Sequence, residues 1–376
     1  MSHEHGMTPT ELRADVPALE ETTYLNFGAH GPSPRYVVDA ATSFLETHEY
    51  DSAGSNPYQT AYDEYDRARA KIADLLGSQP SEIALTESTT DGINRFAGAI
   101  KFEPDDVVVR TDLEHPAGIL PWKRLEARGV EVRVVESTAG RIDTEAFADA
   151  VDGATLACFS AITWTHGTRL PVEELSDIAR DAGTISLVDA VQVPGQTPID
   201  VTDWGADVVV GAGHKWLLGP WGAGFMYIDR EFADDLVPGS IGYRSVETPN
   251  DSEITYKPGA PRFEIGSSSP MPHAGLVEAI EAIEDVGISR IEERIERLTH
   301  RLKDGIDDER LLSPRQFESG LVTIDVEDPE ATVERFAERG IVIRSLPTPD
   351  AVRVSVHAVS TGREIDAVLD ALENES

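Results

Sequence analysis

A lysine beside glycines is the group in this sequence best suited to covalent chemistry. Lys215 follows Gly213 and His214, a few residues after the apolar segment 207–210. An amine at the end of a buried strand is partly desolvated and can form a Schiff base with a carbonyl compound. An ordinary surface lysine is an equally good interpretation of this residue taken alone.

Two further polar groups follow apolar segments and would complement such a lysine. Asp189 ends the segment 185–188, where a buried carboxylate would need a cationic partner such as a protonated pyridine nitrogen. The turn Ser88-Thr89-Thr90 opens a helix, so its N–H groups and hydroxyls could hold a phosphate. A turn aspartate and a simple N-cap are the alternatives at these two places.

Together these groups match the needs of pyridoxal 5′-phosphate (PLP), which are a phosphate anchor, a pyridinium partner and a Schiff-base lysine. No Gly-x-Gly-x-x-Gly motif follows the first strand, and no P-loop motif is present, which disfavours a nucleotide site. Arg353 alternates with Val352 and Val354 on a strand and could clamp a carboxylate, although a solvated sheet face is the alternative.

Helical patterns and short apolar segments alternate along the chain and would position these groups. Strands are predicted over residues 83–85, 107–109, 132–135, 155–159, 185–188, 207–210 and 224–228, and helices over 34–49, 58–76, 89–100, 116–127, 144–151 and 172–181. This alternation predicts an α/β domain with a mainly parallel, doubly wound sheet, whose ligands lie outside the carboxyl ends of the strands.

The C-terminal third has a different pattern. A helical stretch over 273–304, with Gly287 as an interruption, precedes short units from residue 321 onward, which is typical of a smaller α+β domain. We therefore expect an N-terminal arm over residues 1–20, a large domain over 21–255 and a small domain over 256–376.

Composition excludes several classes of protein. The chain of 376 residues has a net charge of −36, so its surface would repel nucleic acid. No apolar stretch approaches the roughly 18 residues that a membrane span needs. Cys158 is the one cysteine, so no intrachain disulfide forms, and His3 and His5 are too isolated for a metal site. The polar N-terminus carries no signal peptide, which predicts a cytoplasmic protein.

The acidic residues are spread along the chain, which has six lysines against 26 arginines. Such an excess of charge strains a folded protein unless salt screens it, so we predict a halophilic host. An ordinary acidic protein is the alternative.

The sequence resembles the class V aminotransferases of PLP fold type I, which include cysteine desulfurases, selenocysteine lyases, isopenicillin N epimerase-like proteins and kynureninases. The resemblance runs from Tyr24 to the last helix. Its most specific stretches occur in the family's order: Glu114-His115-Pro116-Ala117, Leu187-Val188-Asp189-Ala190-Val191-Gln192, Gly213-His214-Lys215-Trp216-Leu217-Leu218-Gly219-Pro220 and Arg262-Phe263-Glu264-Ile265-Gly266-Ser267.

The resemblance implies roles at the cofactor ring. Lys215 resembles the lysine of the internal aldimine, which would also shuttle the substrate α-proton. Asp189 resembles the partner of the pyridine nitrogen, and Gln192 the contact to the phenolic oxygen O3′. His115 resembles the ring that stacks on the pyridine.

The resemblance also implies contacts to the phosphate and the substrate. Thr89, Thr90 and His214 resemble phosphate ligands of one subunit, and Ser267 resembles the phosphate ligand that a second subunit supplies, which implies a homodimer. Two arginines would lie on the substrate side: Arg353 resembles the arginine that holds the α-carboxylate, and Arg344 could be a second cation.

Three departures from the family pattern bear on the activity. Ala212 stands where many relatives carry serine. Trp164 stands where desulfurases carry asparagine, which favours the epimerase-like and kynureninase-like branches. The loop 345–349 lacks the cysteine that desulfurases need, and Cys158 lies in a predicted buried strand, so we expect no desulfurase activity through a protein persulfide.

We therefore expect a PLP-dependent enzyme that acts on a small amino acid through an α-carbanion, with transamination as the first choice. A C–S lyase, an epimerase and a non-catalytic relative remain as alternatives, and a dinucleotide-dependent enzyme is a distant one. The expected partners are a small-molecule substrate and a second copy of the chain, with neither nucleic acid nor membrane.

Overall fold

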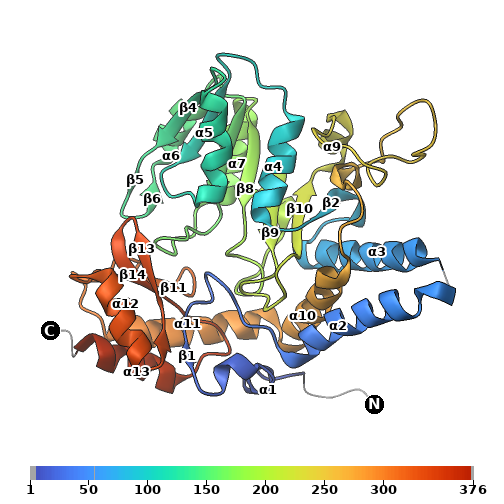
Figure 1. Cartoon of the computed structure of the whole chain (residues 1–376). Coiled ribbons are helices and arrows are strands. Elements are labelled where there is room, and N and C mark those ends of the chain that lie inside the picture. Colours follow the sequence, from blue (N-terminus) through green and yellow to red (C-terminus); the bar gives the residue numbers. More distant parts are fainter. Residues whose placement is uncertain (1–5, 55, 374–376) are drawn as a thin grey trace.

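The computed structural model describes residues 6–54 and 56–373, which are built around a seven-stranded sheet (Figure 1). The strand order is β2-β10-β9-β8-β7-β3-β4, and within this sheet β10 alone runs antiparallel to its neighbours. The strands are β2 (Ile83–Thr86), β3 (Val107–Thr111), β4 (Glu131–Val135), β7 (Leu156–Ser160), β8 (Ile185–Asp189), β9 (Val208–Ala212) and β10 (Gly224–Ile228). The predicted, mainly parallel sheet is confirmed.

Both faces of the sheet are covered by helices, which is why β2, β7, β9 and β10 are buried along their whole length, whereas the edge strand β4 is partly exposed. On one face, Val109 and Phe159 pack in a core that includes residues of α3 (Pro57–Leu76), α6 (Thr144–Val151), α7 (Val172–Asp181) and α10 (Met271–Val286). On the other face, Val108 and Leu187 pack against α4 (Thr89–Ala99), α5 (Leu120–Glu126) and α9 (Arg230–Asp235). Alternate residues of each strand point to opposite faces, so the sheet is doubly wound as predicted.

The C-terminal elements form a second, smaller sheet. Its antiparallel strands, in the order β11-β14-β13, are β11 (Leu321–Ile324), β13 (Arg344–Pro347) and β14 (Asp350–Ser355). One face packs in a core with residues of α11 (Ile288–Asp304), α12 (Pro329–Glu338) and α13 (Gly362–Glu373). The smaller α+β unit is therefore present.

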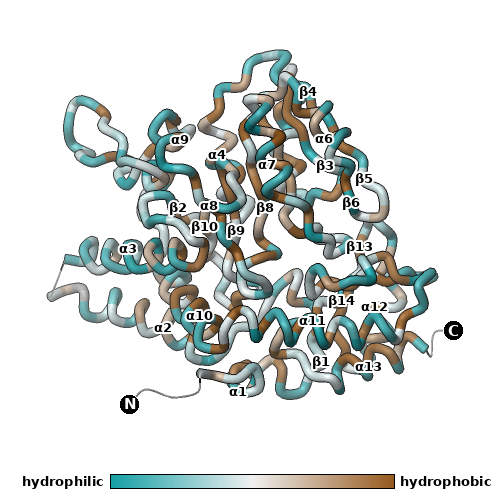
Figure 2. The backbone as a smooth tube through the Cα atoms, turned by 180° about the vertical axis from the view of Figure 1, so that it is seen from behind, coloured by the Kyte–Doolittle hydropathy of each residue, from teal (hydrophilic) through white to brown (hydrophobic). Residues whose placement is uncertain are grey.

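The predicted long helix over 273–304 is two helices, because Gly287 has a φ of 90° that ends α10 before α11 begins. In Figure 2, α10 is largely brown, whereas α11 alternates between teal and brown. This difference reflects packing, since α10 lies against α3 and against α2 (Arg35–Tyr50), while α11 is amphipathic. Our boundary between residues 255 and 256 stays a prediction.

The N-terminal residues connect the two sheets. Residues 1–5, with His3 and His5, lie outside the described part of the expected arm, and α1 (Pro9–Ala14) follows them. Leu12 and Val16 are buried in the main core. Strand β1 (Thr23–Tyr24) then pairs with β12 (Ile341–Val342), which brings residues 26–30 between the large and small sheets.

The remaining short elements of the described residues are α8 (Val201–Trp204), a hairpin of β5 (Ser137–Thr138) and β6 (Arg141–Ile142), and five 3₁₀ turns, of which η4 (Pro116–Gly118) and η5 (Ala260–Phe263) adjoin residues discussed below. Among the described helices, none is long and apolar enough to cross a membrane. Within the same residues, no group of three or more His, Cys, Asp or Glu side chains could hold a metal ion.

Candidate active site

A cavity of about 420 Å³ lies where five parallel strands end. Strands β2, β9, β8, β7 and β3 run in the same direction, so the segments that follow them meet at one edge of the sheet. Eight of the predicted site residues line this cavity: Thr89, Thr90, His115, Asp189, Gln192, His214, Lys215 and Arg344. The structure thus brings together residues that are up to 255 positions apart in the chain.

Lys215 and Asp189 form the polar floor of the cavity. Asp189 is 4% exposed at the end of β8, and its Oδ1 accepts the Val191 N–H at 3.0 Å. Burial raises the pKa of Asp189, and the Val191 N–H and the nearby Lys215 ammonium oppose this shift. Burial lowers the pKa of Lys215 to about 8, an effect that Asp189 opposes. The half-buried Lys215 beside a buried carboxylate is therefore not an ordinary surface lysine. The bond from the Val191 N–H shows that Asp189 also forms the turn contact of the alternative interpretation, although its carboxylate is buried.

Two of the three histidines that line the cavity, His115 and His214, are held in their neutral form. Burial, followed by the charge of Lys215, lowers the pKa of His115 and of His214 to about 4. The Nδ1 of His115 accepts the Ala117 N–H at 3.2 Å, which leaves the proton on Nε2. A neutral, fixed imidazole can stack on an aromatic ring without adding charge to the site.

The start of α4 provides an anion site. Ser88 caps this helix by accepting the Asp91 N–H at 3.1 Å, so the capping interpretation applies to Ser88. The next residue, Thr89, is buried, and its hydroxyl has no hydrogen-bond partner among the described residues. A free buried hydroxyl beside the N–H groups of an 11-residue helix suits a phosphate group.

Gln192 is anchored on two sides. Its Nε2 donates to the Gly28 carbonyl at 3.0 Å, and its Oε1 accepts the Trp216 indole N–H at 2.7 Å. One amide proton remains available. The side chain can therefore offer a single donor to a ligand from a fixed position.

Arg353 lies behind the cavity wall rather than on a solvated sheet face, because the segments that carry Trp164 and Gly28 lie against its guanidinium. The side chain is 1% exposed, and its Nη1 donates to the Trp164 carbonyl at 2.6 Å. Its Nε and Nη2 have no hydrogen-bond partner within the described chain. A Cβ on Gly28, which lines the cavity, would lie 2.9 Å from that Nη2. Burial, and then Arg344, lowers the pKa of Arg353 to about 9.

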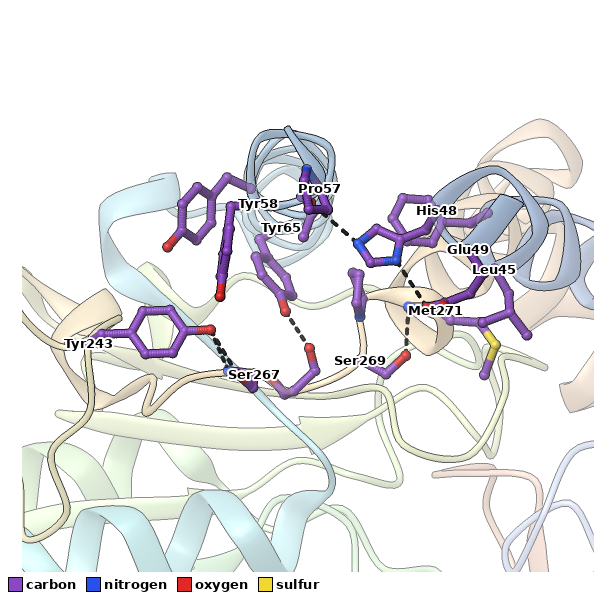
Figure 3. Close-up of a pocket in the computed structure, with 15 residues that line it drawn as sticks. Leu45, His48, Glu49, Pro57, Tyr58, Tyr65, Tyr243, Ser267, Ser269 and Met271 are labelled. Carbon is purple, nitrogen blue, oxygen red and sulfur yellow. Dashed lines mark hydrogen bonds and ion pairs between the residues drawn. The ribbon is translucent and has the colours of Figure 1, made fainter. Parts of the chain in front are cut away.

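Ser267 lies outside this cavity in its own chain. It is exposed, follows η5, and its hydroxyl and N–H lie 3.0 Å and 2.8 Å from the Tyr243 hydroxyl. Figure 3 shows it beside a separate groove lined by Tyr58, Tyr65 and Met271. The predicted phosphate contact therefore requires a second copy of the chain.

The structure adds two residues that sequence reasoning missed. His30 and Trp221 line the same cavity, and the Trp221 indole N–H donates to the His30 Nδ1 at 3.0 Å. The Trp221 ring also stacks on His214 at 4.5 Å. Trp221 could have been predicted as a site residue, because it lies only six positions after Lys215 in the sequence. His30 gave no such signal, because it comes from the N-terminal segment that follows β1, which pairs with β12.

Glu114 is a buried acid beneath the cavity. Its carboxylate accepts hydrogen bonds from the Thr111 hydroxyl at 2.7 Å and from the Ser160 N–H and hydroxyl at 3.1 and 2.6 Å. Burial nevertheless raises the pKa of Glu114 to about 7, and the charge of Asp189 adds to this. Glu114 therefore holds the segment that carries His115 against β7.

The one cysteine of the chain is not accessible for sulfur chemistry. Cys158, the single cysteine, is fully buried in β7, and burial raises the pKa of its thiol. The thiol is therefore neutral and inaccessible, which makes it a packing group rather than a nucleophile.

Comparison with known proteins defines the family. The class V aminotransferase model matches residues 23–368, so the chain belongs to this family. A probable cysteine desulfurase of Methanothermobacter thermautotrophicus is 32% identical over 98% of each chain. The cysteine desulfurase of Haloferax volcanii is 27% identical over 96% of this chain and 95% of its own.

Solved structures share the fold over nearly the whole chain. The apo cysteine desulfurase of Thermococcus onnurineus NA1 has a TM-score of 0.90 and 28% identity, and the match covers 98% of both chains. The cystine C–S lyase C-DES, solved with its product cysteine persulfide, has a TM-score of 0.90 and 25% identity over 96% of this chain and all of its own. A C-DES mutant carries glycine covalently linked to its PLP cofactor, at a TM-score of 0.91.

The cavity fits the cofactor of this family. The unpartnered Thr89 hydroxyl suits its phosphate, buried Asp189 suits its pyridinium nitrogen, and the amine of Lys215 suits its aldehyde. The protein is a PLP-dependent enzyme of class V and fold type I, as the resemblance implied.

Proposed function

We propose that the protein is a PLP-dependent C–S lyase that breaks the Cβ–S bond of a sulfur-containing amino acid by α,β-elimination. The observation that carries this proposal is the complete burial of Cys158 in β7, together with a loop 345–349 that contains no cysteine. Without an accessible thiolate the protein has no acceptor for sulfur, so the sulfur must depart with the substrate's own leaving group.

The relatives support elimination over the transamination that the sequence analysis placed first. Their names describe cleavage of a C–S bond, and C-DES was solved with cysteine persulfide as its product. A persulfide that leaves as a small molecule requires no cysteine on the enzyme. This matches the present chain, in contrast to desulfurases that use a cysteine nucleophile.

The residues of the cavity have distinct parts in this chemistry. When bound, PLP supplies an electron sink for the negative charge that develops at the substrate Cα. The Nζ of Lys215 takes the α-proton, and its lowered pKa keeps a fraction of the amine neutral near pH 7. Asp189 would hold the pyridinium proton, and the neutral ring of His115 would contact the face of the cofactor ring. Arg353 binds the α-carboxylate through its free Nε and Nη2.

The reaction balances without an oxidant or reductant. The α-proton moves to Lys215, the Cβ–S bond breaks, and its electron pair leaves on sulfur, which takes up a proton. The released aminoacrylate adds water and loses ammonia to give pyruvate. With cystine, one water is consumed and the products are pyruvate, ammonia and cysteine persulfide.

We further propose that the enzyme works as a cytoplasmic homodimer. Support comes from Ser267, which is exposed beside an apolar groove of about 420 Å³ lined by tyrosines (Figure 3). A groove of this kind on a chain so acidic is a natural contact for a second copy. In the dimer, Ser267 would reach the phosphate of the partner's site.

The test is product analysis with the PLP-loaded enzyme and cystine. We expect pyruvate and sulfane sulfur in equal amounts, independent of any added α-keto acid. Lys215→Ala should abolish this activity, whereas Lys123→Ala, which removes an exposed lysine of α5, should leave it intact. Product formation only in the presence of an α-keto acid acceptor would instead identify a transaminase.

A further inference from the structure

A buried histidine at the end of the small sheet reaches the segment that carries Lys215. His357 comes two residues after β14 and is fully buried. Its Nε2 lies 3.0 Å from the backbone carbonyl oxygen of Trp216, the residue that follows Lys215. Its Nδ1 accepts the Val359 N–H at 3.2 Å, so the ring proton is on Nε2 and is donated to the Trp216 carbonyl. The small sheet therefore donates a hydrogen bond directly beside the reactive amine.

This imidazole is neutral and satisfied at both nitrogens. Burial lowers the pKa of His357 to about 4, and the hydrogen bond to the Trp216 carbonyl opposes this shift. An apolar side chain of similar size would fill the same space without the cost of removing two ring nitrogens from water. Packing alone therefore does not account for a histidine here, and its hydrogen bonds are what the residue supplies.

The ring of His357 also stacks on two buried aromatic side chains. Its centre lies 4.9 Å from that of Phe27 and 5.9 Å from that of Trp216, with interplanar angles of 28° and 19°. Both aromatic side chains are fully buried, and Phe27 precedes Gly28, which lines the cavity. His357 therefore joins the N-terminal segment to the segment that follows β9.

Trp216 carries this constraint to two groups of the cavity. Its indole N–H donates to the Gln192 Oε1 at 2.7 Å, and its backbone continues from that of Lys215. A Cβ on Gly195 would overlap the Trp216 carbonyl oxygen, and a Cβ on Gly31 would overlap that of Lys215. The backbone of this segment is thus pressed against two glycines, and His357 holds it there.

A second connection runs from the small sheet to the same floor of the cavity. The N–H of Gly320, just before β11, donates to the Gln196 Oε1 at 2.8 Å, and the Gln196 Nε2 donates to the Gln192 carbonyl. A Cβ on Gly320 would lie 2.9 Å from the Trp216 ring. The position of the small sheet therefore constrains Gln192 and the Lys215 segment together.

We propose that His357 is a positioning residue of the PLP site, which orients the Lys215 amine and the Gln192 amide through Trp216. His357 is not among the described residues that line the cavity, so it acts through Trp216 rather than on the cofactor. A displacement of about 1 Å at a catalytic group can cost about 100-fold in rate. The inference needs only the PLP dependence of the family, so it applies whichever bond of the substrate is broken.

The first test measures the capture of PLP by the cofactor-free enzyme at pH 8, close to the pKa of Lys215, as a change in visible absorbance. His357→Phe keeps a flat ring for stacking but removes the donor, and we expect PLP capture to slow at least about 10-fold. His357→Gln places an amide N–H near the position of Nε2 and should restore part of the rate. The control His300→Phe, at a half-buried histidine of α11, should stay within about 2-fold.

The second test does not depend on the folding of His357→Phe. Trp216→Phe keeps an aromatic ring but loses the N–H that holds Gln192, whose amide the resemblance places on the phenolic oxygen of PLP. In the PLP-loaded enzyme, the pH midpoint of the visible band should shift in Trp216→Phe in the same direction as in Gln192→Leu. A rate of PLP capture in folded His357→Phe equal to that of the unmodified enzyme would overturn the proposal, as would an unchanged midpoint in Trp216→Phe.

Discussion

The reactivity of Lys215 provides the sharpest quantitative prediction. Burial lowers the pKa of this amine from 10.5 to about 8 in the cofactor-free protein. At pH 7, a pKa of 8 leaves about a tenth of the amine neutral, whereas a pKa of 10.5 leaves roughly 0.03%. Only the neutral amine attacks an aldehyde, so the structure predicts a roughly 300-fold faster reaction with PLP at pH 7 than an exposed lysine would show.

The assay follows the visible absorbance change when cofactor-free enzyme is mixed with PLP between pH 6 and pH 10.5. Because the neutral form is the reactive one, the rate should rise about tenfold per pH unit below pH 8 and level off above about pH 9. Asp189 opposes the shift, so Asp189→Asn should move the midpoint to lower pH. Arg353 contributes to the shift, so Arg353→Gln should move it to higher pH. A midpoint above about pH 10 in the unmodified enzyme would refute the desolvated site from which this reasoning starts.

Four further predictions concern stability and the supporting residues. Cys158→Ala should retain sulfur release from cystine, and loss of turnover in a folded variant would contradict a lyase without a protein thiol. Gly28→Ala places a Cβ 2.6 Å from the buried Leu321 Cδ2 and 2.9 Å from the Arg353 Nη2, so it should displace the guanidinium, raise KM about 10-fold or more and also lower the melting temperature. The pKa of Glu114 rises from 4.5 to about 7 on folding, so the native state binds the extra proton and stability falls as pH rises through this window, by about 3 kcal/mol in total. Denaturant titrations at several pH values should show that the free energy of unfolding of Glu114→Gln no longer falls by this amount between pH 4.5 and pH 7. A net charge of −36 predicts a melting temperature that climbs between dilute buffer and molar KCl, and equal values in both would contradict the halophilic interpretation.

Short-range sequence patterns were sufficient to predict the strands of the large sheet and the polar residues at their carboxyl ends. All seven predicted strands are present, because each is a short and mainly apolar segment, and most of them alternate with helical patterns. Asp189 and Lys215 each follow such a run, and parallel strands that are neighbours in a sheet bring their carboxyl ends together. The floor of the site was therefore predictable from short segments and one topological rule.

Residues that enter the site from outside the large sheet were harder to predict. Arg353 could equally have faced solvent, since a strand with alternating valines defines an apolar face but not what covers the other face. Trp221 is 66% exposed and His30 comes from a distant N-terminal segment, so neither had a periodic signal. Their positions depend on how the small sheet and the chain termini pack against the large one.

The amino-acid sequence by itself determined the strands, the PLP-type groups at their ends and the lack of a reactive cysteine loop, because these properties depend on residue type and short-range pattern. Only the tertiary structure decided that Arg353 is buried with its guanidinium on the Trp164 carbonyl, and that Ser267 lies away from the cavity of its own chain. Desolvation and long-range charge interactions depend on distances between remote segments. Those distances exist only once the two sheets have packed together.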